Sequence, residues 1–392
     1  MSVVRMEEGG GVIPYGRQCV DEDDIAAVIE VLRSDWLTQG PSTDRFEEKV
    51  AAYCGVGHAC ATANATAALH LACLGLGLGP GDTLWTSPNT FVASANCALY
   101  CGAKVDFVDI DPQTYNMSVA LLRDKLVDAK QRGTLPKVVV AVHFAGQACE
   151  MAEIASLATE YGFYVIEDAS HAIGGRYRGE AVGCCRYSDM TIFSFHPVKI
   201  ITTGEGGMVL TNNPALHDKV LMLRSHGITR DEVKMTSPSH GPWYYQQVDL
   251  GYNYRLTDIQ AALGMSQMRR LDDFITRRRT LANRYDNLLA DLPVVTPWRH
   301  SDCLSAWHLY VIRLAKETRR QVFELLRASG IGVNVHYIPV HTQPYYQALG
   351  FVVGDFPEAE RYYEEALTLP LFPGLTDVEQ ERVISVLREA LR

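Results

Sequence analysis

The stretch Tyr164-Val165-Ile166-Glu167-Asp168 predicts a buried strand that ends in a carboxylate. Similar short, apolar, β-rich runs alternate with helical patterns between about residues 55 and 212. Such alternation is typical of an α/β fold, in which helices flank a mainly parallel sheet. The runs occupy residues 83–87, 105–109, 138–144, 164–168, 191–195 and 208–211. Ligands bind such sheets beyond the carboxyl ends of the strands, and Asp168 falls at one of these ends.

Lys199 follows the next β-rich run, in Ser194-Phe195-His196-Pro197-Val198-Lys199, and precedes the glycine-rich stretch Gly204-Glu205-Gly206-Gly207. A lysine amine can form an imine with the aldehyde of pyridoxal phosphate. A carboxylate can keep the pyridine nitrogen of that cofactor protonated, so that the ring accepts electrons. We therefore predict pyridoxal 5′-phosphate as the cofactor and Lys199 and Asp168 as the catalytic residues. His196 is expected only to line the site.

The composition bounds the class of protein and its partners. A chain of 392 residues with 47% hydrophobic residues is expected to form about two to three cores. The net charge of -10 argues against a nucleic-acid partner. The one dense basic run, Arg277-Arg278-Arg279, is expected on a solvated or substrate-edge helix face. No apolar stretch is long enough to span a membrane, so no membrane contact is expected.

The cysteines indicate the compartment. Ten cysteines occur without metal-binding spacing, so no metal site is predicted. Residues 1–11 lack the basic and apolar regions of a signal peptide. Scattered cysteines in a large acidic chain are typical of a cytoplasmic protein.

Two domains are expected. The sheet and its helices form a large cofactor-binding domain, residues 13–260, and a smaller C-terminal α+β domain covers residues 261–392. A helical pattern over about residues 258–289 bridges the two and carries the arginines on its polar side. Within the small domain, strand-like patterns occupy 307–314 and 331–337, and helical patterns occupy 319–329 and 377–391.

A phosphate site is predicted where Asn64-Ala65-Thr66-Ala67-Ala68-Leu69-His70 begins a helix. The free backbone N–H groups of a helix N-terminus and the Thr66 hydroxyl can bind a phosphate dianion. The alternative is a plain helix cap. Ser194 can offer its hydroxyl to the same phosphate, and its alternative role is to cap the end of a strand.

Two further residues are cofactor-binding candidates. Phe91 follows a strand in Ser87-Pro88-Asn89-Thr90-Phe91 and could stack on the cofactor ring, with core packing as the alternative. His171 lies three residues after Asp168 and could orient that carboxylate by a hydrogen bond. A satisfied core histidine is the alternative for this residue.

Four motifs together resemble those of the DegT/DnrJ/EryC1/StrS sugar aminotransferases, and the resemblance extends over about residues 13–392. The motifs occupy residues 167–171, 193–199, 202–207 and 251–260. The resemblance implies a fold-type-I pyridoxal-phosphate transferase in which Lys199 is the Schiff-base lysine. It also implies a homodimer with shared active sites. The other implied cofactor contacts are Asp168 at the pyridine nitrogen, Phe91 on the ring, Ala65, Thr66 and Ser194 at the phosphate, and Asn253 from the neighbouring subunit.

Within the family, the segments 14–16, 35–40, 224–228 and 335–339 are similar to those of one branch. That branch aminates a UDP-linked 4-keto-6-deoxy-N-acetylhexosamine for pseudaminic acid biosynthesis, and L-glutamate is the expected donor. The residues implied to line the sugar site are Tyr15, Trp36, Leu37, Thr38, His336, Tyr337, Ile338 and Pro339.

Other functions stay open at this point. The substrate could be another nucleotide 4-keto sugar, of the legionaminic, perosamine or aminoarabinose type. A non-catalytic binding protein of the same fold is a more distant alternative, since it would not need Lys199 or Asp168. The polar segment 231–245 is not placed by any motif.

Overall fold

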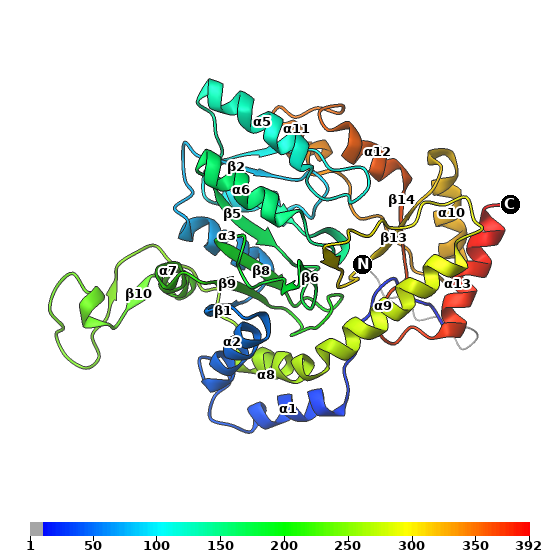
Figure 1. Ribbon diagram of the computed structural model, residues 1–392. Coiled ribbons are helices and arrows are strands. Elements are labelled where there is room, and N and C mark those ends of the chain that lie inside the picture. The colour runs from blue at the N-terminus through cyan, green and yellow to red at the C-terminus, as the bar shows by residue number, and fades with distance from the viewer. Residues whose placement is uncertain (1–10) are drawn as a thin grey trace.

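A seven-stranded sheet forms the centre of the computed structural model, which describes residues 11–392 (Figure 1). The strand order is β1-β9-β8-β5-β4-β2-β3. Neighbours among β2, β3, β4, β5 and β8 pair in parallel, whereas β9 is antiparallel to both β8 and β1. The strands are β1 (His58–Thr62), β2 (Thr83–Thr86), β3 (Lys104–Phe107), β4 (Val138–Val142), β5 (Tyr164–Asp168), β8 (Met190–Ser194) and β9 (Gly207–Thr211). The prediction of a mainly parallel sheet is confirmed.

Helices cover both faces of this sheet because successive side chains of each strand point to opposite faces. Val165 of β5 belongs to the apolar cluster on one face and Ile166 to the cluster on the other. The first cluster contains α2 (Pro41–Cys54), α5 (Val119–Arg132), α6 (Met151–Tyr161) and α8 (Asp258–Gln267). The second contains α3 (Ala65–Gly75), α4 (Ala93–Tyr100) and α7 (Pro214–Arg224). Helix α1 (Glu22–Leu32) packs on α8.

The C-terminal part has its own apolar cluster. It is built on α9 (Leu271–Leu288), β13 (Tyr310–Arg313), α10 (Lys316–Ala328), β14 (Ala366–Leu369) and α13 (Asp377–Ala390). The strand expected over residues 331–337 is wrong: Ile331 and Asn334 make isolated bridges to Ile13 and Thr368, two different partners, so no ladder forms. The domain boundary at residues 260/261 stays a prediction.

The predicted bridging helix is interrupted. A 3-10 turn, η3 (Met268–Arg270), separates α8 from α9, and Arg270 leaves helical geometry at φ −110° and ψ 6°. The Arg270 guanidinium instead binds Asp24, in the first turn of α1. The expectation of a solvated arginine face is wrong for Arg278, which is 1% exposed. Its guanidinium donates to the backbone carbonyls of Trp307, His308 and Leu371.

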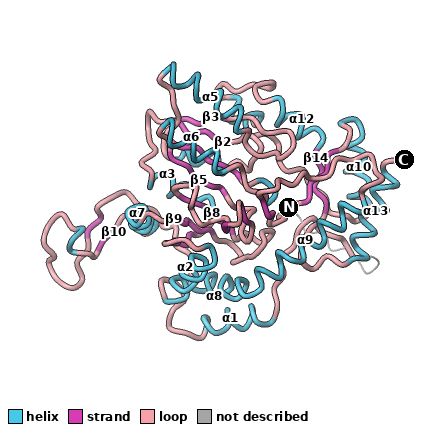
Figure 2. The backbone as a smooth tube through the Cα atoms, viewed as in Figure 1, coloured by secondary structure: helices cyan, strands magenta, loops and turns pink. Residues whose placement is uncertain are grey.

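The unplaced segment 231–245 lies at the end of an arm. Strands β10 (Ile228–Thr229) and β11 (Gln246–Gln247) pair antiparallel, and the chain between them extends away from the sheet and its helices (Figures 1 and 2). Trp243 on this arm is 74% exposed. Among residues 11–392, no helix is both long and apolar enough to cross a membrane.

Short elements complete the fold. They are η1 (Phe144–Gly146), β6 (Arg176–Tyr177), β7 (Glu180–Ala181), η2 (Glu232–Lys234), β12 (Cys303–Leu304), η4 (Val340–Thr342), α11 (Pro344–Gln347) and α12 (Pro357–Glu365). Most of segment 1–11, which is not expected to be a signal peptide, lies outside the described residues.

Candidate active site

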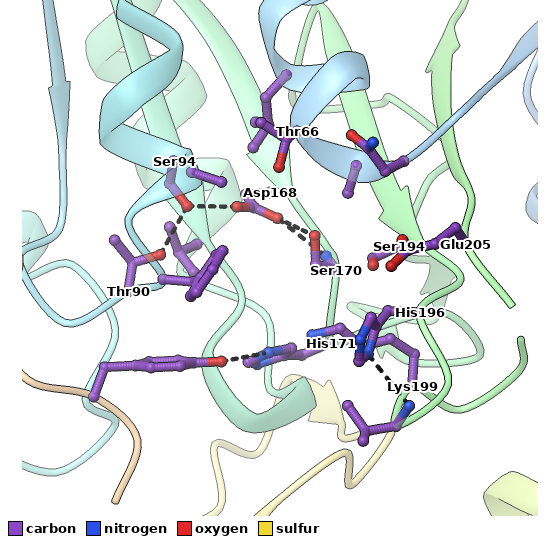
Figure 3. A pocket seen from close by; sticks show the side chains of 18 residues that line it. Thr66, Thr90, Ser94, Asp168, Ser170, His171, Ser194, His196, Lys199 and Glu205 are labelled. Carbon is purple, nitrogen blue, oxygen red and sulfur yellow. Dashed lines mark hydrogen bonds between the residues drawn. The ribbon is translucent and has the colours of Figure 1, made fainter. Parts of the chain in front are cut away.

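A cavity of about 460 Å³ opens at the carboxyl ends of the parallel strands, the position expected for this type of sheet (Figure 3). The ends of β5 and β8, the N-terminus of α3 and the loop after β2 all contribute to its walls. This volume lies within the range of small-molecule and cofactor sites. The predicted residues that line it are Ala65, Thr66, Phe91, Asp168, His171, Ser194, Lys199 and Tyr337.

Lys199 reaches the cavity from a turn that follows β8. Its N–H donates to the His196 carbonyl at 2.9 Å, which closes the turn Ser194-Phe195-His196-Pro197-Val198-Lys199. Loss of hydration lowers the pKa of Lys199 to about 8, and the negative charge of Asp168 opposes this shift. Far more of the amine is therefore unprotonated near neutral pH than for an ordinary lysine, as a nucleophile or base requires.

Asp168 ends β5 and is held by two serine hydroxyls. Ser94 Oγ donates to Asp168 Oδ2 at 2.6 Å, and Ser170 Oγ donates to Oδ1 at 2.6 Å (Figure 3). The Ser170 backbone N–H also donates to Oδ1, at 3.2 Å. The prediction that His171 orients this carboxylate is wrong, because both ring nitrogens of His171 have other partners.

His171 connects the loop after β5 with the C-terminal part of the chain. Its Nδ1 accepts the N–H of Ala145 at 3.3 Å, and its Nε2 lies 3.1 Å from the hydroxyl of Tyr337. Because Nδ1 is an acceptor, a neutral ring carries its proton on Nε2 and donates it to Tyr337. Burial, together with the charge of Lys199, lowers the pKa of His171 well below its usual range. The ring is therefore neutral, and it lines the cavity as a fixed donor.

The N-terminus of α3 has the features of a phosphate site. Asn64 caps the helix by accepting the Ala67 N–H at 2.8 Å, and its carbonyl accepts the first helical N–H, from Ala68. The N–H groups of Ala65 and Thr66 precede these bonds and lie at the cavity. Such amides, with the positive end of the helix dipole, favour a phosphate dianion.

Gly207, the first residue of β9, allows this helix end to lie against the sheet. A Cβ at this position would meet the backbone of Asn64 at 2.5 Å and the nitrogen of Ala65 at 2.6 Å. Any side chain would thus push the helix start away from β9. The lysine, the carboxylate and the helix end in one cavity fit a molecule with an aldehyde, a pyridine nitrogen and a phosphate, as pyridoxal phosphate has.

The remaining candidates lie outside this cavity in the same chain. Trp36 lines a separate groove of about 480 Å³ together with Arg224 and Arg255. Trp36 and Leu37 are largely exposed, and Thr38 forms a bridge with Thr257.

Asn253 forms a bridge with Ser225, and its neighbours Tyr252 and Tyr254 line a hollow that shares Asn64 and Thr66 with the cavity. Asn253 itself is not part of either wall.

Four predicted sugar-binding residues surround Tyr337 without lining the cavity. Tyr15 packs on His336 at a ring distance of 5.5 Å. The buried His336 ring has its Nδ1 2.8 Å from the Thr368 hydroxyl, and burial lowers its pKa to about 3. Ile338 is exposed and Pro339 is buried.

Ser94, Thr90 and Ser170 are site residues to which the sequence assigned no role. Thr90 directly precedes the predicted Phe91, and Ser170 directly precedes the predicted His171. Ser94 is the second residue of α4, and its N–H donates to the Phe91 carbonyl at 3.2 Å. Thr90 and Ser94 are four residues apart, and this spacing is the sequence signal that could have predicted a contact between their hydroxyls.

Comparison with known proteins agrees with this site. The sequence pattern of the DegT/DnrJ/EryC1/StrS aminotransferase family matches residues 18–388. The spore coat polysaccharide biosynthesis protein SpsC of Bacillus subtilis is 39% identical over 97% of both chains. The UDP-4-amino-4,6-dideoxy-N-acetyl-beta-L-altrosamine transaminase of Campylobacter jejuni is 40% identical over 92% of both chains.

Solved structures agree with the sequence relatives. Helicobacter pylori PseC, an aminotransferase involved in the biosynthesis of pseudoaminic acid, superposes with a TM-score of 0.88 at 30% identity, covering 97% of this chain and 99% of its own. The PLP form of the sugar aminotransferase Spr1654 from Streptococcus pneumoniae has a TM-score of 0.87 at 29% identity, covering 97% and 100%. Pyridoxal 5′-phosphate is the cofactor of such enzymes, and the predicted fold type and cofactor are confirmed. On sequence, fold and site alike, the chain belongs to the DegT/DnrJ/EryC1/StrS aminotransferase family.

Proposed function

We propose that this aminotransferase moves an amino group from L-glutamate to a UDP-linked 4-keto-6-deoxy-N-acetylhexosamine and so makes the 4-amino sugar used in pseudaminic acid biosynthesis. Two relatives support this substrate. The Campylobacter jejuni protein carries the name of such a transaminase, and the Helicobacter pylori structure is described by its part in that biosynthesis.

The observation that carries the proposal is that Lys199, Asp168 and the start of α3 line one cavity. When bound, pyridoxal phosphate supplies an aldehyde that condenses with amines and a ring that accepts the electron pair of a carbanion. The N–H groups of Ala65 and Thr66 would hold its phosphate, and Asp168 would hold its pyridine nitrogen. Phe91 lines the same cavity and would stack on the ring.

Lys199 is proposed to move the protons of the reaction. Its lowered pKa of about 8 lies close to a physiological pH, where a base can both accept and return a proton. In the first half-reaction, Nζ would take the proton from the α-carbon of glutamate. In the second half-reaction, the same atom would return a proton to C4 of the sugar.

The histidines near Lys199 support this assignment by their neutrality. Burial lowers the pKa of His171, His308 and His336, and the charge of Lys199 adds to the effect. Neutral rings at these positions avoid a second positive charge beside the lysine. They therefore leave the acid and base steps to Nζ.

The active site is proposed to be completed by a second copy of the chain. Asn253 and the segment 36–38 lie outside the cavity of their own chain, although the family resemblance assigns them to the site. Trp36 and Leu37 are 55% and 47% exposed, as expected of apolar residues that a partner subunit would cover. A two-fold dimer would place each such residue twice, once at each site.

A second candidate is amination of a different nucleotide 4-keto sugar. The spore coat polysaccharide protein is as similar as the altrosamine transaminase and covers more of this chain. The nucleotide and the stereochemistry at C4 therefore need a direct test.

Product analysis tests the proposal. The purified enzyme, loaded with cofactor and glutamate, is offered a panel of UDP- and GDP-linked 4-keto-6-deoxy sugars, and the products are identified by NMR. We expect a 4-amino product from the UDP-N-acetylhexosamine substrate and none with Lys199→Ala. Faster conversion of a GDP-linked or non-acetylated sugar would favour the second candidate. Failure with every keto sugar, while glutamate still converts the cofactor, would contradict both.

A cytoplasmic location is part of the proposal. All ten cysteines are free thiols, which is the usual state in a reducing compartment.

A further inference from the structure

Asp168 receives three hydrogen bonds from the protein, distributed unequally over its two oxygens. Oδ1 accepts the hydroxyl and the backbone N–H of Ser170, at 2.6 Å and 3.2 Å. Oδ2 accepts only the hydroxyl of Ser94, at 2.6 Å (Figure 3). An ionised carboxylate offers about four acceptor sites. The three protein donors therefore leave about one site, and Asp168 lines the cavity in which a ring nitrogen would use it.

A second hydroxyl fixes the direction of the Ser94 bond. Thr90 Oγ1 lies 2.7 Å from Ser94 Oγ. Because a carboxylate can only accept hydrogen bonds, the Ser94 hydroxyl must donate to Asp168. The Thr90 hydroxyl must then donate to Ser94. The result is an ordered chain of donors, Thr90 to Ser94 to Asp168.

This chain is shielded from water. Ser94 is 1% exposed, Thr90 is 2% exposed and Asp168 is 6% exposed. In such surroundings hydrogen bonds to a charged group are stronger than in water, and successive bonds polarise one another. The two hydroxyls flank Phe91, Thr90 just before it and Ser94 in the first turn of α4, so one short segment would set the ring face and the carboxylate together.

We propose that Ser94, oriented by Thr90, is a positioning residue that holds the Asp168 carboxylate aimed at the pyridine nitrogen of the cofactor. The inference rests on the role proposed for Asp168. It predicts an asymmetry between the two serines. Ser170→Ala leaves a backbone N–H on Oδ1, whereas Ser94→Ala leaves Oδ2 without a protein donor.

Glu167, the neighbour of Asp168 on β5, offers a control. Ser188 Oγ donates to Glu167 Oε1 at 2.5 Å, and Glu167 is as buried as Asp168. Glu167 precedes Asp168 in β5, so its side chain points to the opposite face of the sheet. It does not line the cavity. Ser188→Ala therefore removes a serine hydroxyl from a buried carboxylate, whose Oε1 keeps the Thr191 hydroxyl at 3.2 Å, without touching the cofactor site.

The test uses the holoenzyme loaded with pyridoxal phosphate labelled with ¹⁵N in its ring. The ¹⁵N chemical shift reports whether the ring nitrogen is protonated. We expect Ser94→Ala to move the shift toward the unprotonated form and to slow the glutamate half-reaction about 10- to 100-fold, the range for a hydrogen bond to a charged group. Thr90→Val should have a smaller effect in the same direction. Ser94→Thr, which restores a hydroxyl, and Ser188→Ala should leave the shift unchanged.

The variants separate this inference from the role of Asp168. If Asp168→Asn changes the shift and Ser94→Ala does not, the positioning role is overturned and the role of Asp168 stands. If Asp168→Asn changes neither shift nor rate, the role proposed for Asp168 fails first. In the Asp168→Asn background, Ser94→Ala should add little, since the charge that it supports is gone. An undiminished additional loss there would also overturn the inference.

Discussion

The hydroxyl of Tyr337 lies 3.1 Å from Nε2 of His171, which joins the C-terminal part of the chain to the loop after β5. His171 Nδ1 accepts the Ala145 N–H, so Nε2 carries the ring proton and donates it to Tyr337. The hydroxyl proton of Tyr337 is then free for a ligand in the cavity. Burial raises the pKa of Tyr337, which keeps this proton in place at neutral pH.

Tyr337→Phe should weaken the keto-sugar half-reaction. The substitution removes the free donor and leaves the Nε2–H of His171 without its acceptor. We expect KM for the keto sugar to rise about 10-fold, as for loss of one hydrogen bond, with little change in the glutamate half-reaction. Single-turnover kinetics of each half-reaction measure the two effects. Tyr285→Phe is the control, because its buried hydroxyl donates to the Pro370 carbonyl, outside the cavity, at 2.9 Å.

Equal weakening of both half-reactions in Tyr337→Phe would show that the hydroxyl supports the cofactor or the fold. In that case, thermal unfolding of the apo protein would distinguish a role in cofactor binding from a role in the stability of the fold. A lower Tm matching that of Tyr285→Phe would indicate the fold.

The lowered pKa of Lys199 predicts how apo protein captures its cofactor. Only the unprotonated amine attacks the aldehyde, so the capture rate should rise with pH and level off above about 8, where an ordinary lysine would still be rising toward its usual value near 10.5. Stopped-flow absorbance of apo protein mixed with pyridoxal phosphate measures the midpoint. A midpoint near 10 would contradict the shift.

Borohydride identifies the amine that holds the cofactor. Reduction of the holoenzyme should fix the cofactor to the peptide that contains Lys199, and mass spectrometry of the digest reports the site. Lys199→Ala should give no reduced adduct and should lose transamination by at least about 10²- to 10⁴-fold, the contribution of a positioned base, with the loss of covalent catalysis added to it. Labelling of a different lysine would remove Lys199 from its assigned role.

The strands of the sheet and the polar residues at their ends were predictable because a buried strand has a local apolar sequence pattern. Val138–Val142 lies buried on both faces of the sheet, so every residue in the run is apolar. A polar residue that ends such a run, as Asp168 does, stands out. Strand β1 leaves a weaker mark, because its small residues in His58–Thr62 do not form a β-rich run.

Features that depend on contacts distant in sequence were not predictable. The buried guanidinium of Arg278 donates to the backbone carbonyls of Trp307, His308 and Leu371. Only the folded C-terminal part brings these carbonyls together. A helix pattern alone places Arg278 on the polar side. The bond from Ser94 to Asp168 spans 74 residues and depends on the parallel order of the sheet.

Trp36 tests whether a second subunit completes the sugar site. The side chain is 55% exposed and lies in a groove apart from Lys199, so Trp36→Ala should cost the isolated chain little stability. We expect KM for the keto sugar to rise while the glutamate half-reaction changes little. Leu32→Ala is a control for loss of an exposed apolar side chain, since Leu32 is 54% exposed and lines neither the cavity nor the Trp36 groove. An unchanged KM in Trp36→Ala would remove this residue from the sugar site.

Hybrid dimers test whether Asn253 serves the site of the other subunit. A Lys199→Ala subunit and an Asn253→Ala subunit, each inactive as a homodimer, are mixed under conditions that exchange subunits. If Asn253 acts across the interface, each hybrid has one site with both defects and one site with neither. Random pairing of equal amounts makes about half of the dimers hybrid, so about a quarter of the wild-type activity should return.

The opposite geometry gives a different result in the same mixture. If Asn253 serves the site of its own chain, every site in a hybrid keeps one defect, and activity stays at the level of the unmixed variants. Native mass spectrometry of differently tagged subunits confirms that hybrids have formed. Asn253 lies outside the Lys199 cavity of its own chain, bridged to Ser225, so recovery is the expected outcome. Proven hybrids without recovery would reject the shared site.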